Sequence, residues 1–333
     1  MKHFQYLTLL IGLTLMGCAT SNSNDSDINQ HESKPSSQKG HGLPSPEVVM
    51  DESSIDIPFE LDKNFPAPVV MVEIMGKGPY KFVVDTGASG SILIRKSVVD
   101  GLDVPTIGYA MVGDASQKNP QKVPLVLIES ARVGDLQLSN IMTIAMEPSV
   151  DHAASIPDYL DGILGMELFA DLLLTLDYPE NIIRVQKPGA AHLNEHNSIV
   201  YNYDNSAIEI PVRIADQTFP ILVDSGHRGT ITLPKSLSEV LPLSEALVEI
   251  GKTATVTNTY TREQSRFETV VGIAGYELLN PPVVFADEHT PKLLGNGVLQ
   301  HFAITIDQQS RRIQFARESK APIANVILHG EGI

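Results

Sequence analysis

Residues 82–89 read FVVDTGAS, and residues 221–228 read ILVDSGHR. In both stretches an apolar run leads into an aspartate, which a hydroxyl residue and a glycine follow. Two acids on equivalent loops can meet on a pseudo-twofold axis. Two carboxylates held that close cannot both ionise easily, so they share a proton and can activate water. The two stretches therefore predict a fold of two equivalent halves and an enzyme whose acids are Asp85 and Asp224.

The similarity between the halves continues beyond the aspartate loops. Each half ends with an apolar-apolar-Gly block, ILG at residues 163–165 and LLG at residues 293–295. The spacing from Gly165 to Asp177 equals that from Gly295 to Asp307. Such fixed spacing is hard to obtain by chance, so we predict an internal repeat. Asp177 and Asp307 end strand-like runs, where we expect turn residues rather than catalytic acids.

Short apolar and β-branched runs bounded by Gly, Pro, Asn or Asp predict a mostly β chain. The predicted strands are residues 69–74, 80–84, 123–128, 172–176, 182–186, 208–214, 219–223, 270–273, 303–306 and 312–315. Short helices are predicted at residues 96–101, 165–169, 235–241 and 297–300.

Composition narrows the classes of partner. The chain has 333 residues and a formal net charge of -16, which argues against nucleic acid or anionic lipid because both bind basic surfaces. We expect an acidic, soluble monomeric body. The single cysteine, Cys18, excludes an intramolecular disulfide.

The N-terminal residues indicate export. Residues 4–16 are mostly apolar and lead into LMGCA at residues 15–19, a pattern typical of a secretory signal too short to span a membrane. The LMGC segment resembles the bacterial lipobox, which implies that Cys18 is lipidated and anchors the protein in the cell envelope. By the same resemblance Ala19 favours the outer membrane, facing the periplasm. A plain signal peptide with a chance cysteine is the alternative.

These signals divide the chain into five parts. Residues 1–18 form the signal peptide and residues 19–54, rich in Ser, Asn, Asp, Gly and Pro, a flexible tether. Residues 55–190 and 191–320 form the two lobes, and residues 321–333 a C-terminal tail.

The repeated pattern of apolar-apolar-Asp-Thr/Ser-Gly followed by apolar-apolar-Gly resembles the pepsin and retropepsin aspartic peptidases. Bacterial retropepsin-like proteins with both halves fused in one chain are the closest match, over residues 68–317. The resemblance implies two β-barrel-like lobes related by a pseudo-twofold axis, with Asp85 and Asp224 catalytic and no metal or other cofactor. It also implies that Thr86 and Ser225 bond across to the partner loop. Gly87 and Gly226 leave room where backbones and substrate approach closely.

Two regions depart from the family pattern. The second loop continues with His227 and Arg228 where small residues are usual. One hypothesis is that Arg228 or protonated His227 favours the ionised form of Asp224; the alternative is that both point to solvent. The flaps that cover substrate lack the pepsin pattern. Our candidates are Tyr109 and Gly113 in the first half and Thr257 in the second. The alternative for Tyr109 is that it is an ordinary core or edge residue.

Residues 192–196 read HLNEH, the H-x-x-E-H form of some zinc peptidases. That motif needs a helix, and this stretch lies in the joint between the halves, so we predict a chance match and no metal site.

Two functions remain. The first is an envelope aspartic endopeptidase that hydrolyses peptide bonds of proteins or peptides, and the alternative is an inactive relative that binds a peptide or protein partner. A purely structural lipoprotein explains neither acid.

Overall fold

The computed structural model describes residues 46–61, 66–113, 121–146, 159–189, 193–202, 207–254, 259–288, 290–324 and 326, together with the backbone of residues 6–7 and 12–13. Most of this chain is β-strand. The described helices are short: α1 (Lys96–Leu102), α2 (Asn296–Leu299) and the 3-10 helices η1 (Met166–Phe169) and η3 (Lys235–Glu239). No helix in the described ranges has the length and apolar character needed to cross a membrane.

The first lobe is a sheet of nine strands in the order β2-β8-β9-β5-β6-β11-β7-β10-β3. Its strands are β2 (Gly12–Leu13), β3 (Glu47–Val49), β5 (Val69–Ile74), β6 (Lys77–Val84), β7 (Ile92–Arg95), β8 (Thr106–Gly113), β9 (Gln121–Val133), β10 (Leu136–Met146) and β11 (Gly162–Leu164). An additional pairing of β9 with β10 closes the six strands β9-β5-β6-β11-β7-β10 into a barrel.

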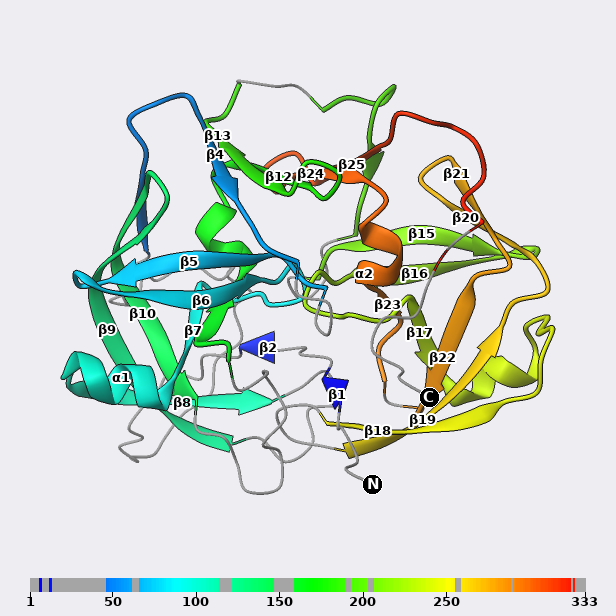
Figure 1. Cartoon of the computed structure of the whole chain (residues 1–333), viewed down its shortest axis with the longest axis horizontal. Coiled ribbons are helices and arrows are strands. Elements are labelled where there is room, and N and C mark those ends of the chain that lie inside the picture. Colours follow the sequence, from blue (N-terminus) through cyan, green and yellow to red (C-terminus); the bar gives the residue numbers. More distant parts are fainter. Residues whose placement is uncertain are drawn as a thin grey trace, which may run out of the picture.

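The second lobe is a sheet of ten strands in the order β1-β18-β19-β22-β17-β23-β16-β15-β20-β21. Its strands are β1 (Tyr6–Leu7), β15 (Glu209–Ile214), β16 (Gln217–Val223), β17 (Ile231–Pro234), β18 (Val248–Ala254), β19 (Thr259–Arg266), β20 (Val270–Ile273), β21 (Tyr276–Leu279), β22 (Pro282–Ala286) and β23 (Leu293–Leu294). Figure 1 shows the two lobes side by side.

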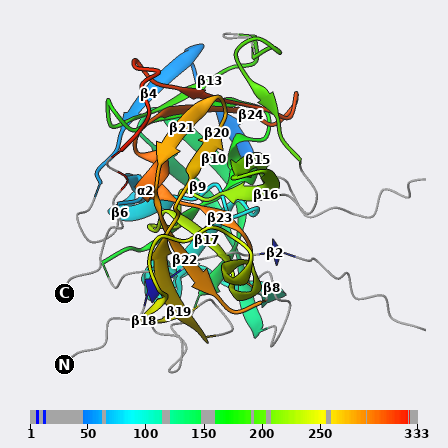
Figure 2. The same ribbon diagram turned by 90° about the vertical axis from the view of Figure 1, so that its right-hand side faces the viewer.

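The third sheet joins the halves. It holds β4 (Ser54–Pro58), β12 (Leu173–Asp177), β13 (Ile182–Gln186), β14 (Ile199–Val200), β24 (Ala303–Asp307) and β25 (Arg312–Ala316), in the order β14-β25-β24-β12-β13-β4. At its centre β12 and β24 are antiparallel, and the hydroxyls of Thr175 and Thr305 lie 2.9 Å apart. The sheet lies across one end of both lobes (Figures 1 and 2).

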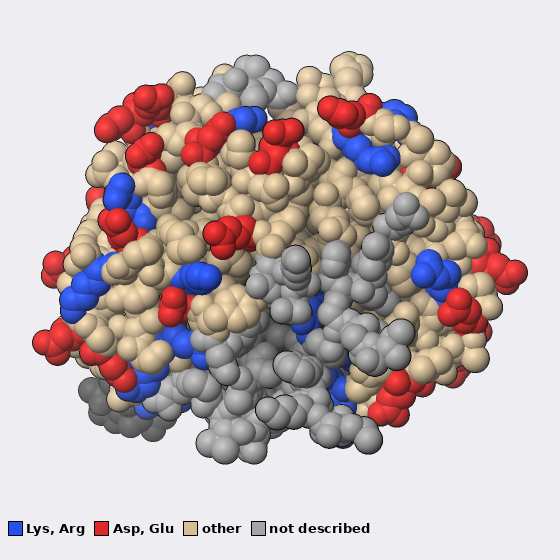
Figure 3. Space-filling view, viewed as in Figure 1, with Lys and Arg blue, Asp and Glu red and all other residues tan. Residues whose placement is uncertain are grey.

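The core follows from alternation along the strands. In β5 and in β15, successive side chains alternate between buried and exposed, as expected for strands with one face on a core. One large hydrophobic cluster runs through both lobes and the third sheet, and a smaller second cluster, which includes Val83, Leu93 and Ile163, lies in the first lobe. Asp and Glu are scattered over the surface of both lobes, with Lys and Arg between them (Figure 3).

The sequence prediction of a mostly β, two-lobed fold is confirmed, and each predicted strand overlaps a strand of the structure. Several strands of the structure were not predicted, among them β7, β8, β17, β18, β19 and β22. Some boundaries differ. The segments predicted as helices at residues 165–169 and 235–241 are single 3-10 turns. The last residues of the expected tether are folded, because β3 pairs with β10 and Met50 is buried. The start of the expected tail is also packed, since Ile323 exchanges backbone hydrogen bonds with Glu277 and Leu279 of β21. Cys18 and residues 19–45 lie outside the described residues.

Candidate active site

The two aspartate loops occupy equivalent places in the two lobes. Asp85 follows β6, which pairs in parallel with β11, and Asp224 follows β16, which pairs in parallel with β23. The apolar-apolar-Gly blocks therefore lie beside the loops and hold them. The backbone N–H of Asp85 donates to Leu164 O, and that of Asp224 donates to Leu294 O, both at 2.9 Å.

Thr86 and Ser225 lock the two loops together. The backbone N–H of Thr86 donates to Ser225 Oγ at 2.9 Å, and the backbone N–H of Ser225 donates to Thr86 Oγ1 at 3.0 Å. Each hydroxyl then donates to a carbonyl beneath the other loop, Thr86 to Val223 O and Ser225 to Val84 O, both at 2.7 Å. All the groups are buried, so this network fixes the separation of the aspartates.

Gly87 and Gly226 are required because the carboxyl groups lie against them. A Cβ on Gly87 would lie 2.8 Å from Cγ of Asp224 and 3.1 Å from Oδ1 of Asp85. A Cβ on Gly226 would overlap the carboxyl group of Asp85. Each glycine therefore lies against the carboxyl group of the opposite loop. Both carboxyl groups thus lie where the two loops meet.

Burial makes the negative charge of this pair costly. Asp85 is 1% exposed and Asp224 is 0% exposed. Burial raises the pKa of Asp85 to about 6. Hydrogen bonds, first among them that from the Gly87 backbone N–H, lower the pKa and offset part of this rise. Burial, and then the negative charge of Asp85, raises the pKa of Asp224 well above its usual value. The pair therefore holds a shared proton in mildly acidic solution.

One oxygen of each carboxyl group is held by backbone and the other is open to a further partner. The N–H of Gly87 donates to Oδ1 of Asp85 at 2.7 Å, and that of His227 donates to Oδ1 of Asp224 at 2.9 Å. Among the described residues, Oδ2 of both aspartates is buried without a hydrogen-bond partner. Two such oxygens, one protonated and one ionised, can hold a water, remove its proton and donate a proton to a carbonyl.

The structure corrects the hypothesis for His227. Its side chain does not point to solvent but is 4% exposed, with Nε2 3.0 Å from Thr232 Oγ1. Burial, followed by the charges of Arg262 and Arg228, lowers the pKa of His227 to about 3. The ring is therefore neutral and cannot supply the positive charge that we considered. For Arg228, which is half-buried, the hypothesis stays a prediction.

The two flap candidates of the first half lie on β8, near the edge of its sheet. Tyr109 is on β8 with 62% of its surface exposed, and Lys122 Nζ lies 4.4 Å from the ring centroid. It is an edge residue and not part of the core. Gly113 ends β8. Thr257 lies outside the described residues.

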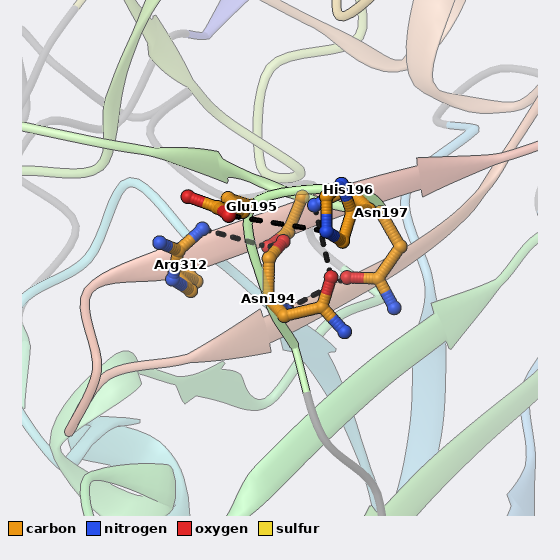
Figure 4. Close-up of polar contacts among 6 residues, drawn as sticks. Asn194, Glu195, His196, Asn197 and Arg312 are labelled. Atoms are coloured by element: carbon orange, nitrogen blue, oxygen red, sulfur yellow. Dashed lines mark hydrogen bonds and ion pairs between the residues drawn. The ribbon is translucent and has the colours of Figure 1, made fainter.

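The H-x-x-E-H segment has no helix. The described part of it is a turn in which Asn194 binds the backbone N–H of His196, and Glu195 and His196 project into solvent (Figure 4). His192 lies outside the described residues, and those that are described contain no cluster of metal ligands. The turn is tied to the third sheet by Arg312, which donates to Ser198 Oγ at 3.2 Å.

Two residues that the sequence reasoning missed also reach the loops. Asn296 donates to the carbonyls of Ser225 and His227, and the hydroxyl of Tyr178 donates to Asn296. Asn296 follows the repeated glycine of the second half, where the first half has Met166, and Tyr178 follows the repeated aspartate of the first half, where the second half has Gln308. A comparison of these paired positions could have identified both residues.

Residues 70–168 match the family model described as aspartyl protease. The match includes the Asp85 loop and the first apolar-apolar-Gly block, and it supports an aspartic protease-like family and a protease-like function. No curated protein matches the chain.

Proposed function

We propose that this chain is an aspartic endopeptidase in which Asp85 and Asp224 activate a water for peptide-bond hydrolysis. The proposal is carried by one observation: two buried carboxyl groups on interlocked, symmetry-related loops, each with an Oδ2 that has no partner among the described residues. A structural role explains neither the burial of two acids against each other nor the loss of stability that it causes.

The chemistry is that of a shared proton. The ionised aspartate takes a proton from the water as the water oxygen attacks the scissile carbonyl carbon, while the protonated aspartate donates to the carbonyl oxygen. The resulting gem-diol collapses when the aspartate that took the water proton passes it to the leaving nitrogen and the amide C–N bond breaks. The other aspartate recovers a proton from a hydroxyl of the diol, which becomes the carboxylic acid, so both acids return to their starting states. Because water is the attacking group, no covalent intermediate with the enzyme forms.

A substrate peptide would lie extended between the lobes. The strands β8 and β18 support this arrangement. Among the described residues, β8 pairs on one side with β9 and on the other only with the two-residue strand β2, and β18 pairs in the same way with β19 and β1. An extended peptide could pair with these strand edges through its backbone, and side-chain pockets would give specificity. Tyr109 would then cover the substrate from β8.

The direct test is cleavage of a mixed peptide library between pH 3 and 7 by the purified chain without residues 1–18. We expect Asp85→Asn and Asp224→Asn each to reduce kcat/KM by at least about 100-fold, because each removes one partner of the proton exchange. Asp307→Asn is the matched control. Its carboxylate caps the turn at Gln309 and Ser310, so we expect unchanged kinetics. Cleavage that persists in both dyad variants would refute the proposal. Specific peptide binding without cleavage by the parent chain would favour the alternative, a binding protein.

We also propose that the enzyme acts at the bacterial cell envelope, anchored through a lipid on Cys18. Support comes from the sequence alone, in the apolar residues 4–16 followed by LMGCA. The test is labelling with a radioactive fatty acid in a bacterial host. We expect a labelled, membrane-associated product from the parent chain and an unlabelled one from Cys18→Ala. Equal labelling of both would contradict the anchor.

A further inference from the structure

The position after the glycine of each apolar-apolar-Gly block differs between the halves. In the second half it is Asn296, whose side chain is fully buried beneath the Asp224 loop. Its Nδ2 donates to Ser225 O at 2.6 Å and to His227 O at 3.1 Å. In the first half the position is Met166, also buried, whose thioether has no hydrogen to donate. Only the second loop can therefore be bound by a side-chain amide from this position.

The amide of Asn296 is oriented by a residue from the other half. The hydroxyl of Tyr178, in the turn between β12 and β13, donates to Asn296 Oδ1 at 2.6 Å. The Tyr178 ring is 2% exposed and packs edge-to-face on Phe59, with 5.7 Å between the centroids. Because Oδ1 accepts this bond, the two hydrogens on Nδ2 are directed at the loop carbonyls. The link crosses from the first half to the second directly below the catalytic loop.

The equivalent position on the other side makes a different contact. Gln308 follows Asp307 as Tyr178 follows Asp177, and its Nε2 donates to the backbone carbonyl of Met166 at 2.8 Å. That carbonyl belongs to η1 and not to the loop that carries Asp85. The backbone bonds are equivalent, since the N–H of Met166 donates to Ala88 O and that of Asn296 donates to His227 O. The side-chain hydrogen bonds from Asn296 to the loop carbonyls are found on the Asp224 side.

The path ends at the carboxyl groups through the backbone of the Asp224 loop. Asn296 donates to the carbonyls of Ser225 and His227, and the N–H of His227 donates to Oδ1 of Asp224 at 2.9 Å. The N–H of Gly226, in the same peptide unit as the Ser225 carbonyl, also lowers the pKa of both aspartates. A peptide whose carbonyl accepts a hydrogen bond is a better donor at its N–H, because chains of hydrogen bonds polarise one another. The hydroxyl of Tyr178 and the amide of Asn296 therefore act on the aspartates through the backbone N–H groups of this loop.

We propose that Tyr178 and Asn296 are positioning residues that direct the backbone N–H groups of Gly226 and His227 at the aspartates and stabilise the negative charge that the pair must carry to accept a proton from water. The Asp85 loop supports this charge through its own backbone, led by the Gly87 N–H, without a side-chain amide behind it. The kinetic consequence rests on the proposed peptidase function, but the effect on ionisation does not.

The surrounding groups allow this effect to be measured. Burial, followed by the charges of Asp224 and Asp85, raises the pKa of Tyr178, so its hydroxyl keeps its proton. The ring of His227 is neutral above its pKa of about 3. Arg228 and Arg262, the cations that act on His227, remain charged throughout. Of these groups near the loops, only the two aspartates titrate between mildly acidic and neutral pH.

The test compares Asn296→Met, which copies the residue of the first half, with Tyr178→Phe and Gln308→Met. Weaker donation by Gly226 makes ionisation of the pair harder, so the acid limb of the kcat/KM profile should move to higher pH. We expect a shift of about 0.5–1 pH unit in Asn296→Met and a smaller one in Tyr178→Phe. Gln308→Met, the matched control, should shift the limb by less than about 0.2. An unmoved limb in Asn296→Met, or an equal shift in Gln308→Met, overturns the proposal.

A second readout does not need catalysis. The carboxyl carbons of aspartate can be labelled with ¹³C and the titration of the two buried groups followed by NMR, with Asp85→Asn and Asp224→Asn for assignment. We expect the lower of the two apparent pKa values to rise in Asn296→Met and in Tyr178→Phe. Absence of cleavage by the parent chain refutes the peptidase but not this result, and an unchanged titration refutes this inference alone. If Asn296→Met does not fold, Tyr178→Phe decides, because its ring still packs on Phe59.

Discussion

Asp85 and Asp224 show at the scale of single residues how the burial on which the proposed catalysis relies opposes stability. Each is buried and has a raised pKa, first because burial removes the carboxylate from water. A carboxyl group whose pKa is higher in the folded than in the unfolded chain stabilises the fold while it is protonated. That contribution is complete below the unfolded pKa near 3.8 and is lost as the pH rises through about 6.

The prediction concerns Asp85→Asn, which replaces the acid with a neutral group of the same shape. At pH 3.5 we expect the free energy of unfolding to equal that of the parent chain. At pH 7.5 the variant should be more stable by about 1–3 kcal/mol, because it has no charge to bury. Urea denaturation at both pH values measures this. Asp216→Asn, in an exposed turn, should change neither value. A gain that is the same at both pH values would contradict the cost assigned to the charge.

At the scale of elements, the interlock between the two aspartate loops holds the site together. Four buried hydrogen bonds join Thr86 and Ser225 to each other's loops. Their strength lies less in the bonds themselves than in the cost of leaving a buried backbone group without a partner. The loops leave different sheets, so this contact, and not strand pairing, sets the distance between the acids.

Ser225→Ala tests this contact. It leaves the N–H of Thr86 and the carbonyl of Val84 without their buried partner, so we expect the free energy of unfolding to fall by about 2–4 kcal/mol. The catalytic rate should fall as well, because the acids are no longer held in register. Ser225→Thr keeps the hydroxyl, as Thr86 does in the other loop, and should retain most of both. Equal stability of the Ala and Thr variants in urea denaturation would show that the interlock contributes little.

At the scale of the whole molecule, the halves are joined by the six-stranded sheet. On one side of the β12–β24 contact lie β24, β25 and β14 of the second half, and on the other lie β12, β13 and β4 of the first half. One hydrophobic cluster runs through both lobes and this sheet. Neither half can be separated without exposing part of the common core.

We therefore expect the body to unfold in a single transition. Differential scanning calorimetry should give equal calorimetric and van't Hoff enthalpies, as for one cooperative unit. Thr175→Val, which removes the hydroxyl contact with Thr305 at the centre of the sheet, should lower the midpoint and keep one transition. Two separate transitions in the parent chain would show that the lobes are independent domains.

Much of the fold could be predicted because the repeat is local. Alternating apolar residues predict strands such as β5 and β15 wherever they lie, and the fixed spacing from Gly165 to Asp177 and from Gly295 to Asp307 predicts equivalent halves. The turn roles of Asp177 and Asp307 are confirmed, since both accept backbone N–H groups. The pairing of β3 with β10 could not be predicted, because a three-residue strand in a polar segment has no periodicity to detect.

The sequence by itself determined the identity of the two acids, the glycines and hydroxyls beside them, and the existence of two similar halves, because each of these is a local pattern that occurs twice. Only the tertiary structure decided how the halves differ. His227 is buried as a neutral ring, whereas the sequence allowed a protonated one beside Asp224. Tyr178 and Asn296, which are 118 positions apart in the chain, are joined by a hydrogen bond. Burial and hydrogen bonding between distant residues depend on packing of the whole fold, and no local pattern encodes them.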